Sequence, residues 1–195
     1  MLSVKENKYT CIIKNSKFIC LIYPIFSLTE VETYLNQAKI DYPDATHYCY
    51  CYILNQERKE SDDGEPSGTA GMPMLQVLEK NNLNHVLCII IRYFGKIKLG
   101  ANGLIRAYSG CVTNCIKEHI IELIDAYVIT ITFPYSILKK IDYILKNSKI
   151  ILKEFHDMVI YQAIIPIDLY DVLCQTNPDI SIKILKKTFI SSSYL

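Results

Sequence analysis

Hydrophobic positions in the first half of the chain follow two different periods. The segment "SLTEVETYLNQAK" repeats apolar residues every three or four positions, and Ser27 precedes Glu30 by three residues, the reciprocal pairing of a capped helix start. The run "HVLCIII" is apolar at consecutive positions, which predicts a strand covered on both faces. "YTCIIKNSKFICLIYPI" predicts two strands joined by a turn at Asn15 and Ser16, and "HYCYCYIL" predicts another. These elements indicate a mixed α/β N-terminal domain.

The glycines of the chain are confined to one region. All seven lie between Gly64 and Gly110, in "DDGEPSGTAG" and in "RYFGKIKLGANGLIRAYSG". From Leu104 to His119 apolar residues repeat at helical spacing, which predicts a long helix with one buried stripe. The segment "RYFGKIKLGAN" is therefore predicted to be the loop that leads from the buried strand into this helix.

The pattern changes after Asp125. "AYVITITF" alternates as a strand does, and the following segments predict a helix, two strands, a helix and a last strand. Strand, helix, two strands, helix, strand is the order of a ferredoxin-like domain of about 70 residues. We therefore predict an α/β (α+β) protein with an N-terminal domain at residues 1–123 and a ferredoxin-like domain at residues 124–195.

Composition limits the class of protein more than its function. The chain has 195 residues, of which 50% are hydrophobic, so it can bury a core. The net charge of +1 excludes neither nucleic acid nor membrane, because a basic patch can be balanced elsewhere. The N-terminus "MLSVKENKYT" lacks the apolar core of a signal peptide, and the uncharged runs are shorter than the roughly 18 apolar residues of a membrane helix. We expect a soluble, cytoplasmic protein without a membrane partner.

The eight cysteines lie mostly inside apolar runs, and no CxxC pair occurs. Cys49 and Cys51 share one face of a strand, and Cys111 and Cys115 one face of a helix, so a four-thiolate zinc site is an alternative. Our prediction is that the cysteines are reduced and act as small buried hydrophobes.

The loop before the long helix has the chemistry of an anion site. Glycine allows close backbone approach, and a loop entering a helix presents free N–H groups at the positive end of the helix dipole. Four basic residues add full charges. The predicted phosphate or nucleic-acid contacts are Arg92, Gly95, Lys96, Lys98, Gly100, Asn102, Gly103 and Arg106. The glycine spacing matches neither GxxxxGK[ST] nor GxGxxG, so a purely structural turn is the alternative.

The upstream loop gathers acidic and hydroxyl side chains. Its candidate functional residues are Asp62, Asp63, Glu65, Ser67 and Thr69. Ser67 or Thr69 is expected to cap the following helix, with Pro73 in its first turn. The carboxylates are alternatively ligands of a divalent cation or partners of the basic loop across a shared cleft, although the EF-hand spacing is absent.

Catalytic patterns are missing from the sequence. The four histidines form no HExxH motif, and no serine or cysteine stands in a nucleophile-elbow context. We therefore predict no catalytic residue, no metal and no cofactor, and the residues do not favour an enzyme.

Three stretches carry a resemblance to the IMPACT/YigZ family: "ATHYCYCYI" (Ala45–Ile53), "DDGEPSGTAGMPML" (Asp62–Leu75) and "RYFGKIKLGANGLIRAYS" (Arg92–Ser109). The resemblance implies an N-terminal fold similar to one domain of a small-subunit ribosomal protein and to the fourth domain of elongation factor G, and a C-terminal domain similar to the last domain of that factor. Eukaryotic members of the family regulate the amino-acid-starvation response and carry an RWD domain. This sequence has no such domain, so we expect the two-domain bacterial type.

Two positions depart from the pattern of the family. Lys96 stands where a second glycine is usual, and Asn102 stands where glycine is usual. Asparagine tolerates left-handed backbone, whereas a lysine held there costs about 1 kcal/mol.

These features together favour a binding protein. We hypothesise a translation-associated regulator that contacts RNA or the ribosome through the basic loop, with a second contact in the C-terminal domain. The first contact consists of Arg92, Lys96, Lys98 and Arg106, and the second consists of Lys183, Lys186 and Lys187. The alternatives are a metal-dependent phosphate- or peptide-handling hydrolase that uses the acidic loop, and a protein-interaction module of a translation stress response.

Overall fold

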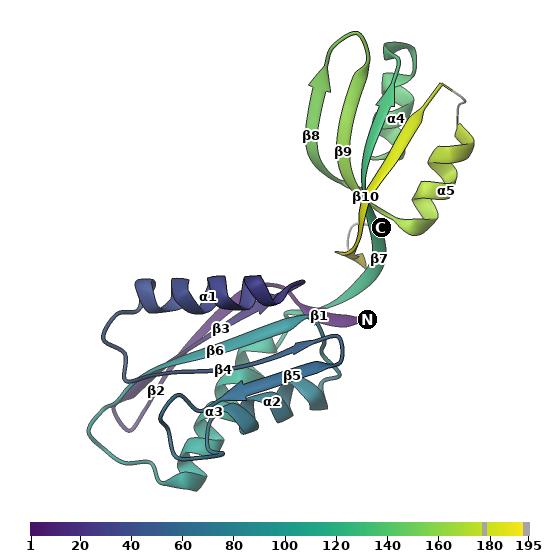
Figure 1. Ribbon diagram of the computed structural model, residues 1–195. Helices are drawn as coiled ribbons and strands as arrows, with labels where there is room; N and C mark the ends of the chain where they lie inside the picture. Colours follow the sequence, from purple (N-terminus) through teal and green to yellow (C-terminus); the bar gives the residue numbers. More distant parts are fainter. Residues whose placement is uncertain (177–178, 193–195) are drawn as a thin grey trace. The chain divides into compact units, whose positions relative to one another are not determined.

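The computed structural model describes residues 1–176 and 179–192 (Figure 1). The chain divides into two compact units, Met1–Ile121 and Glu122–Leu195. Over the described residues both units combine antiparallel sheets with helices, which confirms the predicted α/β (α+β) class. No helix in this part of the chain is long and apolar enough to cross a membrane.

The N-terminal unit is a sheet with helices on both faces (Figure 1). In order across the sheet, the antiparallel strands are β2 (Asn7–Ile13), β3 (Ser16–Pro24), β6 (Val86–Tyr93), β4 (His47–Leu54) and β5 (Glu57–Ser61). Helix α1 (Leu28–Asp41) covers one face, and α2 (Gly71–Lys80) and α3 (Ala101–Ile116) cover the other. The short strand β1 (Leu2–Val4) precedes them, and its Leu2 bridges to Leu83. The sheet therefore lies between two helical layers, each with its own core.

The central strand β6 is apolar at consecutive positions because both of its faces are buried. Ile89 and Ile91 belong to the core beneath α1, whereas Cys88 and Ile90 belong to the core beneath α2 and α3. This alternation confirms the prediction of a strand covered on both faces. Arg92 continues the buried run, so a charged side chain lies buried one residue before the strand ends at the half-buried Tyr93.

The start of α1 follows its predicted capping pair. The Ser27 hydroxyl accepts a hydrogen bond from the Glu30 N–H at 3.3 Å, and the Glu30 carboxylate accepts one from the Phe26 N–H at 2.6 Å. The carboxylate thus reaches one residue further back than a capping box requires. The hairpin turn between β2 and β3 lies one residue earlier than predicted, at Lys14 and Asn15, because both residues hold the left-handed φ of a two-residue hairpin turn.

The C-terminal unit has the strand order of a ferredoxin-like domain. Strand β10 pairs with β7, β7 with β9, and β9 with β8, all antiparallel. The elements are β7 (Ile120–Phe133), η1 (Tyr135–Ile137), α4 (Leu138–Ile144), β8 (Lys149–Phe155), β9 (Val159–Pro166), α5 (Ile167–Thr176) and β10 (Ser181–Ser191). One core joins the strands to both helices, through residues such as Ile131, Ile141 and Leu173. The predicted order of elements is confirmed.

Candidate functional site

The two glycine-bearing loops of the N-terminal unit meet at one pocket. We call residues 62–70 the acidic loop and residues 94–100 the basic loop. The space between them, the loop pocket, has a volume of about 380 Å³. It is lined by Thr46, His47, Gly64, Glu65, Pro66, Arg92, Phe94, Lys98, Leu99, Gly100, Ala101 and Leu104. The two segments that concentrate the glycines of the chain therefore share one surface.

A buried ion pair joins the two sides of the loop pocket. Arg92 Nη1 donates to Glu65 Oε1 at 2.5 Å, and the two side chains are only 5% and 3% exposed. Glu65 Oε1 also accepts from the Tyr108 hydroxyl at 2.7 Å, and Arg92 Nη2 donates to Ser16 Oγ at 3.3 Å. Pairing of the acidic loop with the basic segment, one of the alternatives left open by the sequence, is confirmed for these two residues.

This pairing changes the interpretation of Arg92. Its guanidinium faces Glu65 and lies over the rings of Phe18 and Phe94, 5.2 Å and 5.4 Å from their centroids. Because a buried pair holds its charges more firmly than an exposed one, the guanidinium is committed to the protein. We therefore remove Arg92 from the predicted phosphate contacts and assign it to holding the acidic loop against β6.

His47, from the stretch Ala45–Ile53 that carries the family resemblance, also lines the loop pocket. Its Nδ1 lies 2.7 Å from the Asp63 carbonyl oxygen, and since a carbonyl only accepts, Nδ1 carries the proton. In the neutral ring, Nε2 is therefore an acceptor, 3.9 Å from Glu65 Oε2. His47 lies opposite Arg92 in the register of β4 and β6, and this register brings it to the site.

The acidic loop is organised by Asp62 rather than by its hydroxyl residues. Asp62 Oδ1 accepts from the N–H groups of Ala70 and Gly71 at 2.9 Å and 2.8 Å, and Oδ2 accepts from Gly68 N–H at 2.7 Å. The prediction that Ser67 or Thr69 caps α2 is therefore wrong. Thr69 instead donates its hydroxyl to the Pro66 carbonyl, inside the loop.

The carboxylates of this loop are turned toward donors of the protein itself. Asp63 Oδ2 accepts from the Tyr48 N–H at 2.6 Å, and Asp62 and Glu65 are engaged as described. Among the described residues, no group of three or more His, Cys, Asp or Glu side chains converges as metal ligands would. The contacts of these carboxylates hold the acidic loop to β4, to the start of α2 and to Arg92.

The remaining basic side chains lie on the surface. Lys96, Lys98 and Arg106 are exposed, and no described acidic side chain forms an ion pair with them. Lys98 lines the loop pocket, while Arg106 lines a second pocket of about 230 Å³ together with Lys14 from the β2–β3 turn. Exposed cations therefore lie on the basic loop and next to it. Lys14 is one of these cations, and the sequence patterns did not identify it.

The N-terminus of α3 opens beside these cations. Its N-cap is Gly100, with φ +75°, which provides no side chain to accept from the helix. The first N–H groups of a helix, here those of Ala101, Asn102 and Gly103, have no acceptor within the helix itself. Since Gly100 and Ala101 line the loop pocket, donors and the positive end of the helix dipole lie at its edge.

Gly95 is required by packing. A Cβ at this position would lie 2.1 Å from the Asn15 carbonyl carbon, which no side chain permits. The Gly95 N–H donates to Ser16 Oγ at 3.1 Å, the same oxygen that Arg92 contacts. Lys96, the next residue, has left-handed backbone with φ +64°, so this lysine lowers stability by about 1 kcal/mol. The structural turn and the anion site are thus separate parts of one loop.

Comparison with known proteins identifies similar chains. The family model for the Impact N-terminal domain matches residues 14–116. The IMPACT family member YvyE of Bacillus subtilis (strain 168) is 38% identical over 159 residues, which cover 79% of this chain and 73% of that protein. The IMPACT family member YigZ of Escherichia coli (strain K12) is 33% identical over 111 residues, 54% of each chain. A crystal structure described only as a hypothetical protein matches with a TM-score of 0.60 and 26% identity, over 94% of this chain and 95% of the other.

Proposed function

Because the chain belongs to the IMPACT family, we propose that it is a translation-associated regulatory protein whose N-terminal unit contacts RNA or the ribosome. The family resemblance supports this role through its implied likeness to domains of a ribosomal protein and of elongation factor G. A fold does not define a function by itself, so the proposal depends on the surface of this unit.

The observation that carries the proposal is the exposed charge around the basic loop. Lys96, Lys98 and Arg106 lack acidic partners in the described part of the chain, and the open N-terminus of α3 lies among them. Exposed cations and free helix N–H groups together favour phosphate, because each contributes without first breaking an internal ion pair. RNA supplies phosphates at a spacing that several such groups can contact at once.

The loop pocket offers a place for a base next to this phosphate contact. Phe94 lines it with 42% of its surface exposed, and the Arg92 guanidinium lies over the same ring. Proteins that recognise unpaired RNA stack bases on such aromatic and guanidinium planes. Phe94 is therefore the side chain we assign to base stacking.

The C-terminal unit provides the second contact of the proposal. Lys183 and Lys186 on β10 pair in register with Thr130 and Val128 of β7, and the bulge between Ile184 and Lys186 keeps the two lysines on one face. Lys187 points to the opposite face, because its register partner is Tyr127. All three are exposed, but only Lys183 and Lys186 can contact one phosphate chain from the same side.

Binding of a fluorescent structured RNA across a salt series tests the proposal. One variant carries Lys96→Gln, Lys98→Gln and Arg106→Gln, and a matched control carries Lys39→Gln, Lys59→Gln and Lys80→Gln, which removes three exposed charges elsewhere in the same unit. Loss of three phosphate contacts lowers the slope of log K against log salt by about 2 to 3. The control should keep the slope of the native chain.

Two results contradict the proposal. Equal slopes for the two variants would mean that the basic loop is no privileged contact, and absence of binding at low salt would remove RNA altogether. The protein-interaction reading, with a partner in a translation stress response, then takes its place. Action in the cytoplasm is part of the proposal, because that is where translating ribosomes are found.

A further inference from the structure

A group of thiols lies between the sheet and α3 of the N-terminal unit. All eight cysteines of the chain are free. Cys20, Cys88, Cys111 and Cys115 are buried in the core beneath α2 and α3, and Cys11, on the edge strand β2, is half-buried at its border. Cys11 is therefore the member of this group that a dissolved oxidant can reach.

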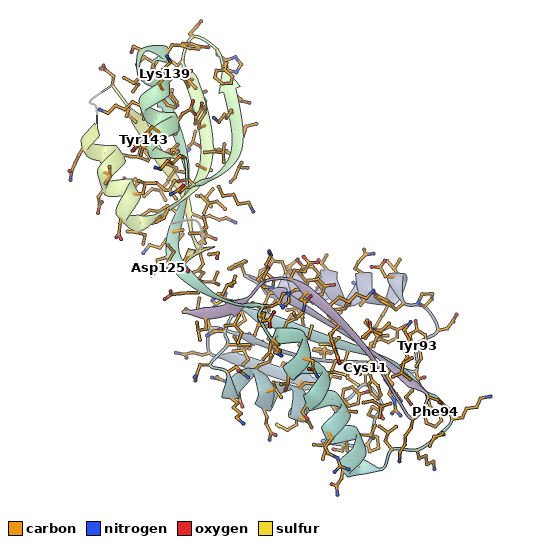
Figure 2. The ribbon with its side chains drawn as sticks, turned by 180° about the vertical axis from the view of Figure 1, so that it is seen from behind. Cys11, Tyr93, Phe94, Asp125, Lys139 and Tyr143 are labelled. Atoms are coloured by element: carbon orange, nitrogen blue, oxygen red, sulfur yellow. The ribbon has the colours of Figure 1, made fainter. Side chains whose placement is uncertain are left out.

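Two of these thiols are in direct contact. The Sγ atoms of Cys11 and Cys111 are 3.1 Å apart, although the residues are 100 positions apart in the chain. A disulfide needs about 2.05 Å between the sulfurs, so they need to approach by only about 1 Å. Figure 2 shows Cys11 on the side of the unit where β2 runs beside α3. The Sγ atoms of Cys20 and Cys88 are 3.5 Å apart, but both side chains are fully buried, which closes that pair to an oxidant.

We propose that Cys11 and Cys111 form a reversible disulfide when the protein is exposed to hydrogen peroxide. The proposal goes beyond the proposed function and does not depend on RNA binding. It assigns a chemical role to two cysteines that their positions in the sequence indicate only as core residues.

The accessible sulfur reacts first and the buried sulfur second. The Cys11 thiolate attacks one peroxide oxygen, the O–O bond breaks, and the leaving oxygen departs as water after taking up a proton. Cys111 Sγ then attacks the sulfenic sulfur of Cys11, the S–O bond breaks, and the thiol proton of Cys111 leaves with the hydroxyl as a second water. Two thiols and one peroxide thus give one disulfide and two waters. Burial raises the pKa of the Cys111 thiol, which suits it to this second role rather than the first.

The disulfide would join strand β2 to helix α3, the two elements next to the exposed cations Lys14 and Arg106. Cys11 lies two residues before Ile13 in the strand that leads to the Lys14 turn, and Cys111 lies on the helix that carries Arg106. A bond between them closes a long loop, which restricts the unfolded chain and raises the melting temperature by roughly 5 to 15 °C. A thiol reductant should reverse both the bond and the shift.

Peptide mapping of the full chain after mild peroxide treatment tests the proposal. Trypsin releases Cys11 in residues 9–14 and Cys111 in residues 107–117, so the disulfide appears as one linked peptide pair under non-reducing conditions. Residues 107–117 also contain Cys115, and for that reason the pair is mapped in Cys111→Ser and Cys115→Ser as well. The proposal expects the link in the native chain and in Cys115→Ser, and its loss in Cys111→Ser and Cys11→Ser.

Cys174 provides the internal control, because it is exposed and lies in the C-terminal unit. Its oxidation reports the dose at which an ordinary surface thiol reacts. The proposal is overturned if Cys174 is oxidised while residues 9–14 stay unlinked in the native chain, or if the link persists in Cys111→Ser. Mapping of the native chain decides the first outcome even if a variant fails to fold.

Discussion

Arg92 and Lys98 both line the loop pocket, yet the fold uses their charges in opposite ways. Arg92 is the last buried residue of strand β6, and its guanidinium is paired with Glu65 from the acidic loop. Lys98 lies exposed on the basic loop, with no acidic partner in the described part of the chain. The difference comes from a tertiary contact, because the acidic loop places Glu65 against the Arg92 side chain. A basic residue in a glycine-rich segment therefore indicates an anion site only when no buried acid lies within reach.

Removal of the acid from the buried pair should give the largest effect. Glu65→Ala leaves the Arg92 guanidinium buried without its partner, and we expect the free energy of unfolding to fall by about 3 to 5 kcal/mol. Denaturant unfolding, followed by circular dichroism, measures the change. Lys98→Ala, at the other wall of the same pocket, should stay within about 0.5 kcal/mol of the native chain.

A second pair of variants separates loss of the charge pair from loss of volume. Glu65→Leu together with Arg92→Met replaces both charges by apolar groups, and this double variant should be more stable than Glu65→Ala. The contrast fails if the free energy of unfolding of Glu65→Ala lies less than about 1 kcal/mol below that of the native chain. Arg92 would then need an acidic partner no more than Lys98 does.

The next prediction compares Gly95, which close packing requires, with Gly110, where a Cβ has room. Gly95→Ala drives a Cβ into the Asn15–Ser16 peptide, and we expect a loss of about 3 kcal/mol, at the upper end of the cost of overpacking. Gly110→Ala is the matched control in α3, where a Cβ meets no atom within 4 Å. It should raise stability by up to about 1 kcal/mol, because alanine is the better helix former. Equal effects at the two sites would show that close packing does not explain Gly95.

Features that depend on neighbouring residues could be predicted from the sequence. The α1 start follows from Ser27 and Glu30, which lie within one helical turn, and the β6 strand follows from its own apolar run. The ferredoxin-like order of the C-terminal unit follows from the succession of periods along the chain. In each case the pattern and its physical cause lie in the same short segment.

Only those features of the site that depend on a single residue and its chain neighbours could be predicted from the sequence. Exposure of Lys96 and Lys98 agrees with their place in a loop. The cap of α2, in contrast, comes from Asp62, eight residues before the Ala70 N–H from which it accepts. The partner of Arg92 is 27 residues upstream, and His47 reaches the pocket through strand register. Contacts across such distances depend on how the sheet and loops pack, and no periodicity records them.

The smallest expected effect tests whether exposed charge at the basic loop has been kept at a cost in stability. Lys96 adopts φ +64°, where glycine is relaxed and lysine is strained. Lys96→Gly should therefore raise the free energy of unfolding by about 0.5 to 1 kcal/mol and, under the proposed function, weaken RNA binding in the same protein. Lys98→Gly serves as the control, since residue 98 is not among those with positive φ and the added flexibility of glycine can only lower its stability. If Lys96→Gly raises stability and lowers RNA affinity, while Lys98→Gly lowers both, the lysine at position 96 serves binding. Loss of stability in Lys96→Gly would instead assign Lys96, like Arg92, to the structure of the loop.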